Sequence, residues 1–256
     1  MAAERVSTGI AALDPLVGGG YLKGRIYLIS GDTGSGKTIA CLQFLVHALR
    51  QGERAVYVTV DERPVEILET AETFAWDLQR YIQEKNLVIL DASPYFGGRG
   101  GGSSEKGVDP QKIVADLGNY ARKLGATLLI IDPVTPLIST ADPNSGRDQT
   151  RSLIQLIQAQ LNVTTLFTAH GGADKSDNGG IERFLAAGVL LVKTTEKDGK
   201  LERVMTIKKM RSSVAEPRAL RFVIRPNEGI ALLGSPDDRS PEPPIFELVD
   251  PAKNVF

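Results

Sequence analysis

Five short apolar runs alternate with helical patterns between residues 25 and 170, and this alternation constrains the fold more than any other feature. Two of the intervening segments, 113–124 and 149–161, repeat apolar residues at spacings of three and four, which places those residues on one face of a helix. Strands that are connected through helices form a parallel sheet on which the helices pack. The sequence therefore predicts an α/β fold with a mainly parallel central sheet flanked by helices. Its expected strands cover residues 25–30, 54–60, 87–91, 127–132 and 164–169.

The pattern changes after residue 186, where strand-like segments follow one another without helices. Asp198–Gly199 separates two of them, and Asp-Gly between strand patterns is typical of a β-hairpin. A second turn is expected at 227–229. Each segment alone exposes too little apolar surface for a separate core, so we expect antiparallel strands added to the C-terminal side of the same sheet. Residues 1–235 are predicted to form one domain.

Two segments have the composition of poorly ordered chain. Residues 96–107 are rich in glycine and have no apolar residue after Phe96, so little offsets the entropy lost on fixing them. We predict a mobile loop there. Residues 236–256 are predicted to form a C-terminal arm, partly extended, because its first half is rich in Pro and Asp. The apolar stretch 245–248 within it is expected to dock on another surface.

Charge and cysteine content exclude several classes of protein. The chain has 30 basic and 31 acidic residues, so no global field attracts nucleic acid or an anionic membrane, and any anion site has to be local. A single cysteine, Cys41, rules out an internal disulfide and suits a reducing compartment. No run approaches 18 apolar residues, and the first residues lack the pattern of a signal peptide. We expect a cytoplasmic protein without a membrane segment.

A glycine-rich octapeptide follows the first apolar run and precedes a helical pattern. Glycines let the backbone curl until several N–H groups face a phosphate group, and the helix N-terminus adds partial positive charge. In the motif G-x-x-x-x-G-K-[ST], or Walker A, the lysine reaches the β- and γ-phosphates and the hydroxyl binds magnesium. A glycine turn with an incidental lysine is the alternative, which the strand-loop-helix context disfavours. The matching residues are Gly31, Asp32, Thr33, Gly34, Ser35, Gly36, Lys37 and Thr38.

An acidic residue, Asp132, ends the fourth apolar run. The apolar residues before it indicate a buried strand, whose end lies at the carboxyl edge of the sheet, where ligands bind in open α/β folds. A magnesium ion that bridges two phosphates needs a carboxylate at this edge, beside the hydroxyl of the loop. The sequence thus predicts Thr38 and Asp132 at the metal, against the alternative that Asp132 merely ends a strand.

A pair of carboxylates, Asp61 and Glu62, directly follows the second apolar run and reaches the same edge. Hydrolysis needs a group there that orients or deprotonates water. Alternatively the pair caps the helix that begins near Pro64, since Asp is favoured at helix N-termini. One carboxylate can cap while the other points into the site, and the sequence leaves open which one.

A basic cluster of Lys208, Lys209 and Arg211 ends a strand pattern far along the chain from the glycine-rich loop. Lysine-rich edge strands commonly protect a sheet against aggregation, so a solvated edge is one interpretation. The other is a local site for the negative charge of a ligand.

The chain resembles a known family over residues 5–235. Its opening, RVSTGIAALDPLVGGGYLKGRIYLISGDTGSGKT, is similar to that of the KaiC-like branch of the RecA-type P-loop ATPases, in which an S-T-G-I-x-x-L-D leader precedes the phosphate loop. Further segments resemble the first, ATP-hydrolysing domain of KaiC in the same order. They are VTVDERP, FAWDL (74–78), LVILDASP (87–94), ERFLAAGVLLV (182–192) and IKKMRSS (207–213).

This resemblance implies a RecA-like fold and slow hydrolysis of ATP, with Mg²⁺, at the interfaces of a homo-oligomeric ring. Six subunits and a regulatory role towards an unidentified protein partner are the family expectation. Asp61 and Glu62 match the adjacent catalytic glutamates of the family, one of which activates water, and the shorter Asp61 leads us to weight Glu62 more. Lys209 and Arg211 match its K-x-R pair, which reaches the ATP of the neighbouring subunit.

The resemblance bears on three further positions. Trp76 aligns with a tryptophan near the subunit interface, and a buried aromatic residue is the alternative. His170 ends the fifth apolar run, where RecA-type proteins place a polar sensor of the terminal phosphate; Thr168 is a second candidate and a structural histidine the alternative. KaiC's second domain phosphorylates a Ser-Thr pair that Arg183 and Phe184 replace here, so autokinase activity is not expected.

Two other functions stay open at this point. A DNA-binding recombinase of the RecA or RadA type has the same core, but the loops 139–148 and 171–180 hold at least as many acidic as basic residues, which argues against a channel for nucleic acid. A nucleotide-gated scaffold that does not hydrolyse ATP is the third reading, and it predicts that Glu62→Gln leaves turnover unchanged.

Overall fold

The computed structural model describes residues 3–93, 109–138, 143–171, 185–197, 199–211, 213 and 216–236 of the 256-residue chain. The predicted mobile loop lies outside these residues. So do Arg183, Phe184, most of the C-terminal arm and most of the loops that bear on nucleic acid binding.

Five neighbouring parallel strands form one side of a nine-stranded sheet, which confirms the predicted parallel core. Nearly every residue of four of them is buried, which explains why the sequence shows continuous apolar runs rather than alternation. The fifth, β5, lies at one edge of the sheet. Their bounds are β3 Ile26–Gly31, β4 Ala55–Thr59, β5 Leu87–Asp91, β6 Leu128–Asp132 and β7 Thr164–His170.

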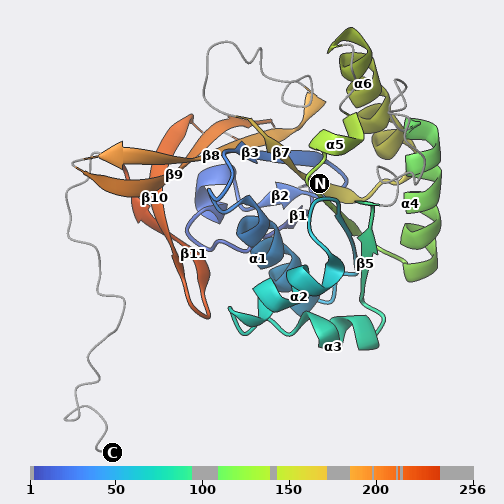
Figure 1. Cartoon of the computed structure of the whole chain (residues 1–256), viewed down its shortest axis with the longest axis horizontal. Coiled ribbons are helices and arrows are strands. Elements are labelled where there is room, and N and C mark those ends of the chain that lie inside the picture. The colour runs from blue at the N-terminus through green and yellow to red at the C-terminus, as the bar shows by residue number, and fades with distance from the viewer. Residues whose placement is uncertain are drawn as a thin grey trace, which may run out of the picture.

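Four further strands continue the same sheet on its other side, in the order β11-β10-β9-β8-β3-β7-β6-β4-β5. β8 pairs parallel to β3, and the pairs β8–β9, β9–β10 and β10–β11 are antiparallel, which confirms the predicted extension. Figure 1 shows these strands on the side of the molecule opposite β5. Their bounds are β8 Gly188–Lys197, β9 Lys200–Met210, β10 Arg218–Arg225 and β11 Gly229–Gly234.

Helices cover both faces of the sheet and enclose two cores (Figure 1). One core packs against α1 Lys37–Arg50, α2 Pro64–Glu72 and α3 Leu78–Gln83. The other packs against α4 Pro110–Leu124, α5 Thr135–Ile138 and α6 Pro143–Gln160, and α4 and α6 contain the two predicted amphipathic segments. Among the described helices, none combines the length and the apolar composition needed to cross a lipid bilayer.

Cys41 and Trp76 are both buried inside the chain. Cys41 is fully buried on α1, as expected. Trp76 is also buried, and its ring stacks on Phe74 with 4.7 Å between the ring centroids. Trp76 therefore packs in its own chain, which is the alternative that the sequence left open.

The N-terminal segment forms local structure that the sequence did not predict. β1 Arg5–Val6 pairs with β2 Tyr21–Leu22, and a short 3-10 helix, η1 Asp14–Val17, lies between them. The Asp14 carboxylate accepts hydrogen bonds from the hydroxyls of Ser7 and Thr8 at 2.5 and 2.7 Å. The S-T-x-x-x-x-x-D leader thus closes a polar turn in front of the central sheet.

Candidate functional site

The glycine-rich octapeptide joins β3 to α1, and two of its glycines are required by the backbone. A Cβ on Gly31 would lie 1.8 Å from the carbonyl oxygen of Val192 on β8, so only glycine allows these strands to approach so closely. Gly36 precedes α1 with φ 101°, a conformation that disfavours other residues. The loop is therefore fixed at the carboxyl edge of the sheet with the N-terminus of α1 beside it.

Lys37 folds back over this loop. Its Nζ donates hydrogen bonds to the carbonyl oxygens of Gly31 at 3.0 Å and Asp32 at 2.8 Å. Burial lowers the pKa of the Lys37 ammonium, although the carboxylates of Asp132 and Asp32 act in the opposite direction. The positive charge is thus held at the centre of the loop by its own backbone.

Asp132 lies at the end of β6, only 7% exposed, and both of its carboxylate oxygens are held by hydroxyls from neighbouring strands. Tyr57 on β4 donates to Oδ2 at 2.7 Å, and Thr168 on β7 donates to Oδ1. The two hydroxyls therefore hold this carboxylate in a fixed orientation. Thr168, one of the two candidate phosphate sensors, thus positions Asp132.

Asp61 and Glu62 have different surroundings. The Asp61 carboxylate lies 3.3 Å from Nε2 of His170, and both side chains are about half exposed. Burial raises the pKa of Glu62, and the carboxylates of Asp132, Glu66 and Asp61 raise it further. The structure thus separates two acids that the sequence presents as a pair, and Glu62 has the environment of a proton acceptor.

The alternative reading of these acids as a helix cap is wrong. The N-cap residue of α2 is Arg63, and no side-chain bond from Asp61 or Glu62 caps the helix. The backbone N–H of Arg63 donates a hydrogen bond at 2.7 Å to the carboxylate of Glu66, which lies in the first turn of the helix. Asp61 and Glu62 instead line a cavity together with Lys37.

A cavity of about 330 Å³ brings these groups together. It contains nine of the residues singled out from the sequence and five that the sequence did not suggest. Gly31, Asp32 and Ser35 belong to the loop but do not line the cavity. The lining residues are Thr33, Gly34, Gly36, Lys37, Thr38, Ile39, Asp61, Glu62, Thr70, Asp132, Pro133, His170, Arg203 and Ile224.

Arg203 is the functional candidate that sequence reasoning missed. Met205 on β9 lies opposite Val192, which pairs with Gly31, so Arg203 stands two residues beyond the carboxyl edge of the parallel strands. The length of the C-terminal strands could have indicated this residue. β8 and β9 have 10 and 11 residues, whereas the parallel strands have five to seven. The β8–β9 hairpin therefore extends past the glycine-rich loop.

Lys209 and Arg211 lie at the opposite edge of the sheet. The backbone N–H of Arg211 donates to Ala187, and that of Ala187 donates to Ile26, at the start of β3. The loop follows the end of β3, five residues and about 17 Å further along the strand. The structure therefore does not bring Lys209 and Arg211 into the cavity of their own chain.

The end of β9 carries a β-bulge. Val189 pairs with Lys209 and Leu190 with Ile207, so Lys208 is an extra residue in the strand. A bulge redirects the side chains that follow it. Burial and the neighbouring Arg211 lower the pKa of Lys209.

The cavity has the donor set for a nucleotide with magnesium. The oxygens of Thr38 and Asp132 are of the kind that Mg²⁺ prefers, and this ion is typically held by one or two protein oxygens together with phosphates. Lys37 and Arg203 supply the positive charge that phosphates need. The residues therefore fit magnesium and a nucleoside triphosphate.

The fold and this loop define the class of the protein, a RecA-type P-loop nucleotide-binding protein. The family model described as "ATPase: KaiC" matches residues 6–237 of the chain. The chain therefore belongs to the KaiC family of ATPases.

Individual relatives agree with this assignment. The chain is 33% identical to the circadian clock protein KaiC3 of Synechocystis sp. over 90% of its own length and 46% of that protein, so it spans about half of that relative. It is 32% identical to a UPF0273 protein of Methanopyrus kandleri over 90% of its own length and 92% of that protein. The crystal structure of a KaiC-like protein from Pyrococcus horikoshii has a TM-score of 0.77 and 28% identity, over 91% of this chain and all of that one.

Proposed function

We propose that this protein is a slow ATPase that binds ATP and Mg²⁺ in the cavity described above, with each nucleotide at an interface of a homo-oligomeric ring of six subunits. One observation carries the proposal: Lys37 and Arg203 line the cavity, whereas Lys209 and Arg211 lie at the other edge of their own sheet. In a ring built from repeated head-to-tail contacts, that edge of one subunit can face the cavity of the next.

Each group has a separate task in this reaction. Lys37 and Arg203 hold the phosphates, and Thr38 and Asp132 hold the magnesium ion, which offsets charge on the β- and γ-phosphates when bound. Glu62 accepts the proton of the water whose oxygen attacks the γ-phosphorus, while the bond to the β–γ bridging oxygen breaks and ADP leaves. Arg211 and Lys209 of the neighbour stabilise the charge that develops on the transferred group.

His170 is placed to report the state of the site. It contacts Asp61 through Nε2, and its backbone N–H donates a hydrogen bond to the hydroxyl oxygen of Thr135 at 3.0 Å, which ties it to α5. A change at Asp61 on hydrolysis would therefore reach α5 through His170. We propose that this link couples hydrolysis to subunit geometry and so to a protein partner, in a cytoplasmic setting.

The decisive experiment mixes two inactive variants, Arg211→Ala and Glu62→Gln. In a ring, some interfaces of the mixture combine the intact Glu62 of one chain with the intact Arg211 of its neighbour. We therefore expect each variant alone to lose about 10²-fold or more in turnover, and the mixture to regain activity up to about a quarter of the parent.

The outcomes discriminate between the functions considered. If the mixture stays as inactive as its components, Arg211 acts within its own chain or not at all, and the proposed ring mechanism is wrong. If Glu62→Gln keeps full turnover, the hydrolytic role of Glu62 is wrong. Salt-dependent binding of single-stranded DNA at physiological ionic strength would instead favour the recombinase function.

A further inference from the structure

The chain just beyond β9 is supported by a contact from the N-terminal segment. β9 ends at Met210, one residue before Arg211, and the backbone N–H of Arg211 donates to the carbonyl oxygen of Ala187 at 2.7 Å. Ser213, two residues further on, lies against the glycine turn that precedes β2, where a Cβ on Gly18 would stand 2.8 Å from the Ser213 hydroxyl oxygen. The ladder sets side-chain directions only within the strand, so the placement of Arg211 depends on contacts beyond it.

This turn, residues 17–20, is itself held firmly, and we call it the leader turn. Arg5 on β1 donates hydrogen bonds through one guanidinium nitrogen to the carbonyl oxygens of Val17 at 3.4 Å and Gly20 at 2.7 Å. Its three glycines all have positive φ angles, a conformation that other residues rarely adopt. A turn that one guanidinium ties at both ends is a rigid support for Ser213.

A second contact from the same segment reaches the residue between the two cations of the K-x-R pair. Met210, 8% exposed, lies over Gly188 beside Tyr27, since a Cβ on Gly188 would be 2.7 Å from both the Met210 sulfur and the Tyr27 ring. Tyr27 in turn stacks on Tyr21 of β2, with 4.2 Å between the ring centroids. The N-terminal segment therefore supports the chain on both sides of Arg211, at Ser213 directly and at Met210 through Tyr27.

We propose that the leader turn positions Lys209 and Arg211 for hydrolysis in the neighbouring subunit, with Gly18 as the positioning residue. This inference rests on the proposed function, in which these two cations act in trans. Residues 5–20 do not line the cavity of their own chain, so their effect on hydrolysis is exerted through the cations. A displacement of a catalytic group by about 1 Å can cost roughly 100-fold in rate. The leader turn sets where the cations stand on their own subunit, and hence where they stand at the nucleotide of the next.

Gly18→Ala tests the inference in the full-length chain. The added Cβ collides with Ser213, so we expect kcat for ATP hydrolysis to fall by about tenfold or more while KM changes by less than about twofold. The matched control is Gly19→Ala. This position also has a positive φ, but the nearest atom to an added Cβ belongs to Arg5, at an ordinary contact distance of 3.6 Å, so kcat should be retained.

Mixing then shows on which subunit the variant acts. Gly18→Ala leaves Glu62 and its cavity intact, so in a mixture with Glu62→Gln it should regain up to about a quarter of the parent activity, as expected for Arg211→Ala. A lesion that merely damaged the variant chain would not be rescued, because every cavity with an intact Glu62 would then belong to a damaged subunit.

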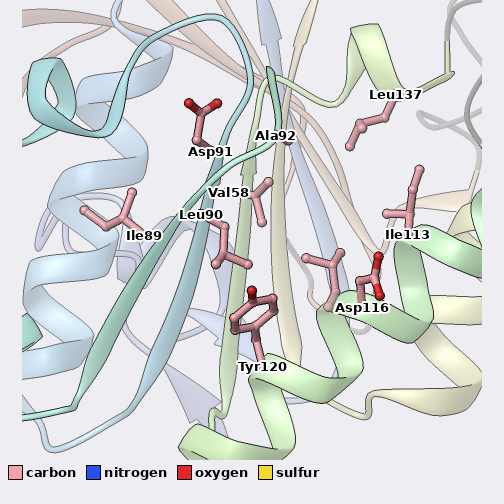
Figure 2. Close-up of a pocket in the computed structure, with 10 residues that line it drawn as sticks. Val58, Ile89, Leu90, Asp91, Ala92, Ile113, Asp116, Tyr120 and Leu137 are labelled. Atoms are coloured by element: carbon pink, nitrogen blue, oxygen red, sulfur yellow. The ribbon is translucent and has the colours of Figure 1, made fainter. Parts of the chain in front are cut away.

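Two further variants separate positioning from stability. Ser213→Leu enlarges the other side of the contact without altering the N-terminal segment, and it should give the same loss of kcat and the same rescue. Leu90→Ala removes a half-buried side chain from the cavity between β5 and α4 that Figure 2 shows, at the β5 edge of the sheet and away from β9. As a truncation of packed apolar atoms, it should lower the Tm without lowering kcat.

The outcomes distinguish this inference from the proposed function. If Arg211→Ala is rescued while both variants of the Gly18–Ser213 contact keep the kcat of the parent, the leader turn does not position the cations. The inference is also wrong if those two variants lose kcat without gaining activity in the mixture, or if the controls lose kcat equally. If Arg211→Ala itself is not rescued by Glu62→Gln, hydrolysis in trans is wrong and the inference falls with it.

Discussion

The two halves of the central sheet contribute to the site in opposite ways. The parallel strands β3, β4, β6 and β7 are short and stop at one edge, where each delivers a residue of the site at its end or within the next three residues. The antiparallel strands β8–β10 are longer and pass this edge, so Arg203 and Ile224 enter the cavity from the middle or the far part of a strand. The parallel half thus supplies groups that meet in one cavity of the same chain. The antiparallel half supplies Arg203 at the carboxyl edge of the parallel strands and Lys209 and Arg211 at their opposite edge.

In the proposed ring, this difference indicates which groups of a subunit would act on its neighbour. Groups of the parallel half are held by contacts inside the chain, as Asp132 is by Tyr57 and Thr168. Lys209 and Arg211 belong to the antiparallel half and lie far from their own loop. A variant in the parallel half should therefore lose ATP hydrolysis both alone and in a mixture with Glu62→Gln. A variant at the end of β9 should regain hydrolysis in such a mixture.

The largest expected effect comes from Lys37→Ala in the parallel half. The ammonium is the one cation that the loop itself holds, and its loss should lower kcat/KM by roughly 10³-fold, about 4 kcal/mol. Steady-state ATP hydrolysis measures this. Lys200→Ala, exposed at the start of β9 and outside the cavity, is the control and should retain activity. Because Lys37 belongs to the same cavity as Glu62, mixing with Glu62→Gln should restore nothing, and restoration would contradict the division between the halves.

Gly31→Ala tests the close approach of β3 and β8, where the two halves of the sheet meet. The added Cβ would collide with the Val192 carbonyl at 1.8 Å, so the strands must separate, at a cost of about 3 kcal/mol in the free energy of unfolding. Urea denaturation gives this value. The control is Gly34→Ala, where no atom lies within 4 Å and only the positive φ is unfavourable, about 1 kcal/mol. Equal destabilisation of the two variants would show that the close approach of β3 and β8 is not needed.

Arg203→Ala separates the two kinds of cation in the antiparallel half. We expect kcat/KM to fall by roughly 10- to 100-fold, since a charge-assisted contact to phosphate is lost. Unlike Arg211→Ala, this variant should not be rescued by Glu62→Gln in a mixture, because Arg203 and Glu62 line the same cavity. Arg218→Ala, on β10 outside the cavity, serves as the control. Rescue would mean that Arg203 also acts on a neighbour.

Much of the fold was predictable because its signals are local. Continuous apolar runs marked the buried parallel strands, and the glycine pattern marked the loop with Lys37 and Thr38. The cavity also contains Asp61, Glu62, Asp132 and His170 because each ends a parallel strand or follows one within three residues.

The remaining features depend on register and on long-range contacts. Arg203 becomes part of the site only through the alignment of β9 with β8, which no local pattern specifies. Likewise, Tyr57 looked like an ordinary core residue, and its bond to Asp132 needs two strands to be neighbours. The cap of α2 at Arg63 was missed because Asp is a better cap former by composition than Arg.

Tyr57→Phe should produce a smaller effect in the parallel half. It removes the hydroxyl that holds Oδ2 of Asp132, and partners of metal ligands typically contribute 10- to 100-fold. We expect the Mg²⁺ concentration for half-maximal hydrolysis to rise by about tenfold while the fold is retained. In the control Tyr27→Phe, the lost hydroxyl accepts a bond from the Leu22 backbone, away from the cavity. An unchanged Mg²⁺ requirement in Tyr57→Phe would show that Asp132 does not need this support.

The smallest effect concerns stability, at two glutamates only four positions apart in the parallel half. The pKa of Glu62 is raised, first by burial, so the folded state binds its proton more tightly than the unfolded state. Stability is therefore lost as pH rises from the ordinary pKa of a glutamate through the raised one. Glu62→Gln removes this loss, and its Tm should exceed that of the parent by about 1–3 °C at pH 7 and match it near pH 4.

At Glu66 the pKa shift and its effect on stability have the opposite sign. Its pKa is lowered, first by the side chain of Arg63, so its contribution to stability is present at neutral pH and is lost as pH falls through the lowered value. Glu66→Gln should therefore melt below the parent at pH 7 and approach it in acid. Thermal unfolding of both variants and the parent between pH 4 and pH 7 tests these signs. If the Tm of both variants changes in the same direction relative to the parent, the charged form of Glu62 does not destabilise the fold. The assignment of Glu62 as the proton acceptor then loses its physical basis.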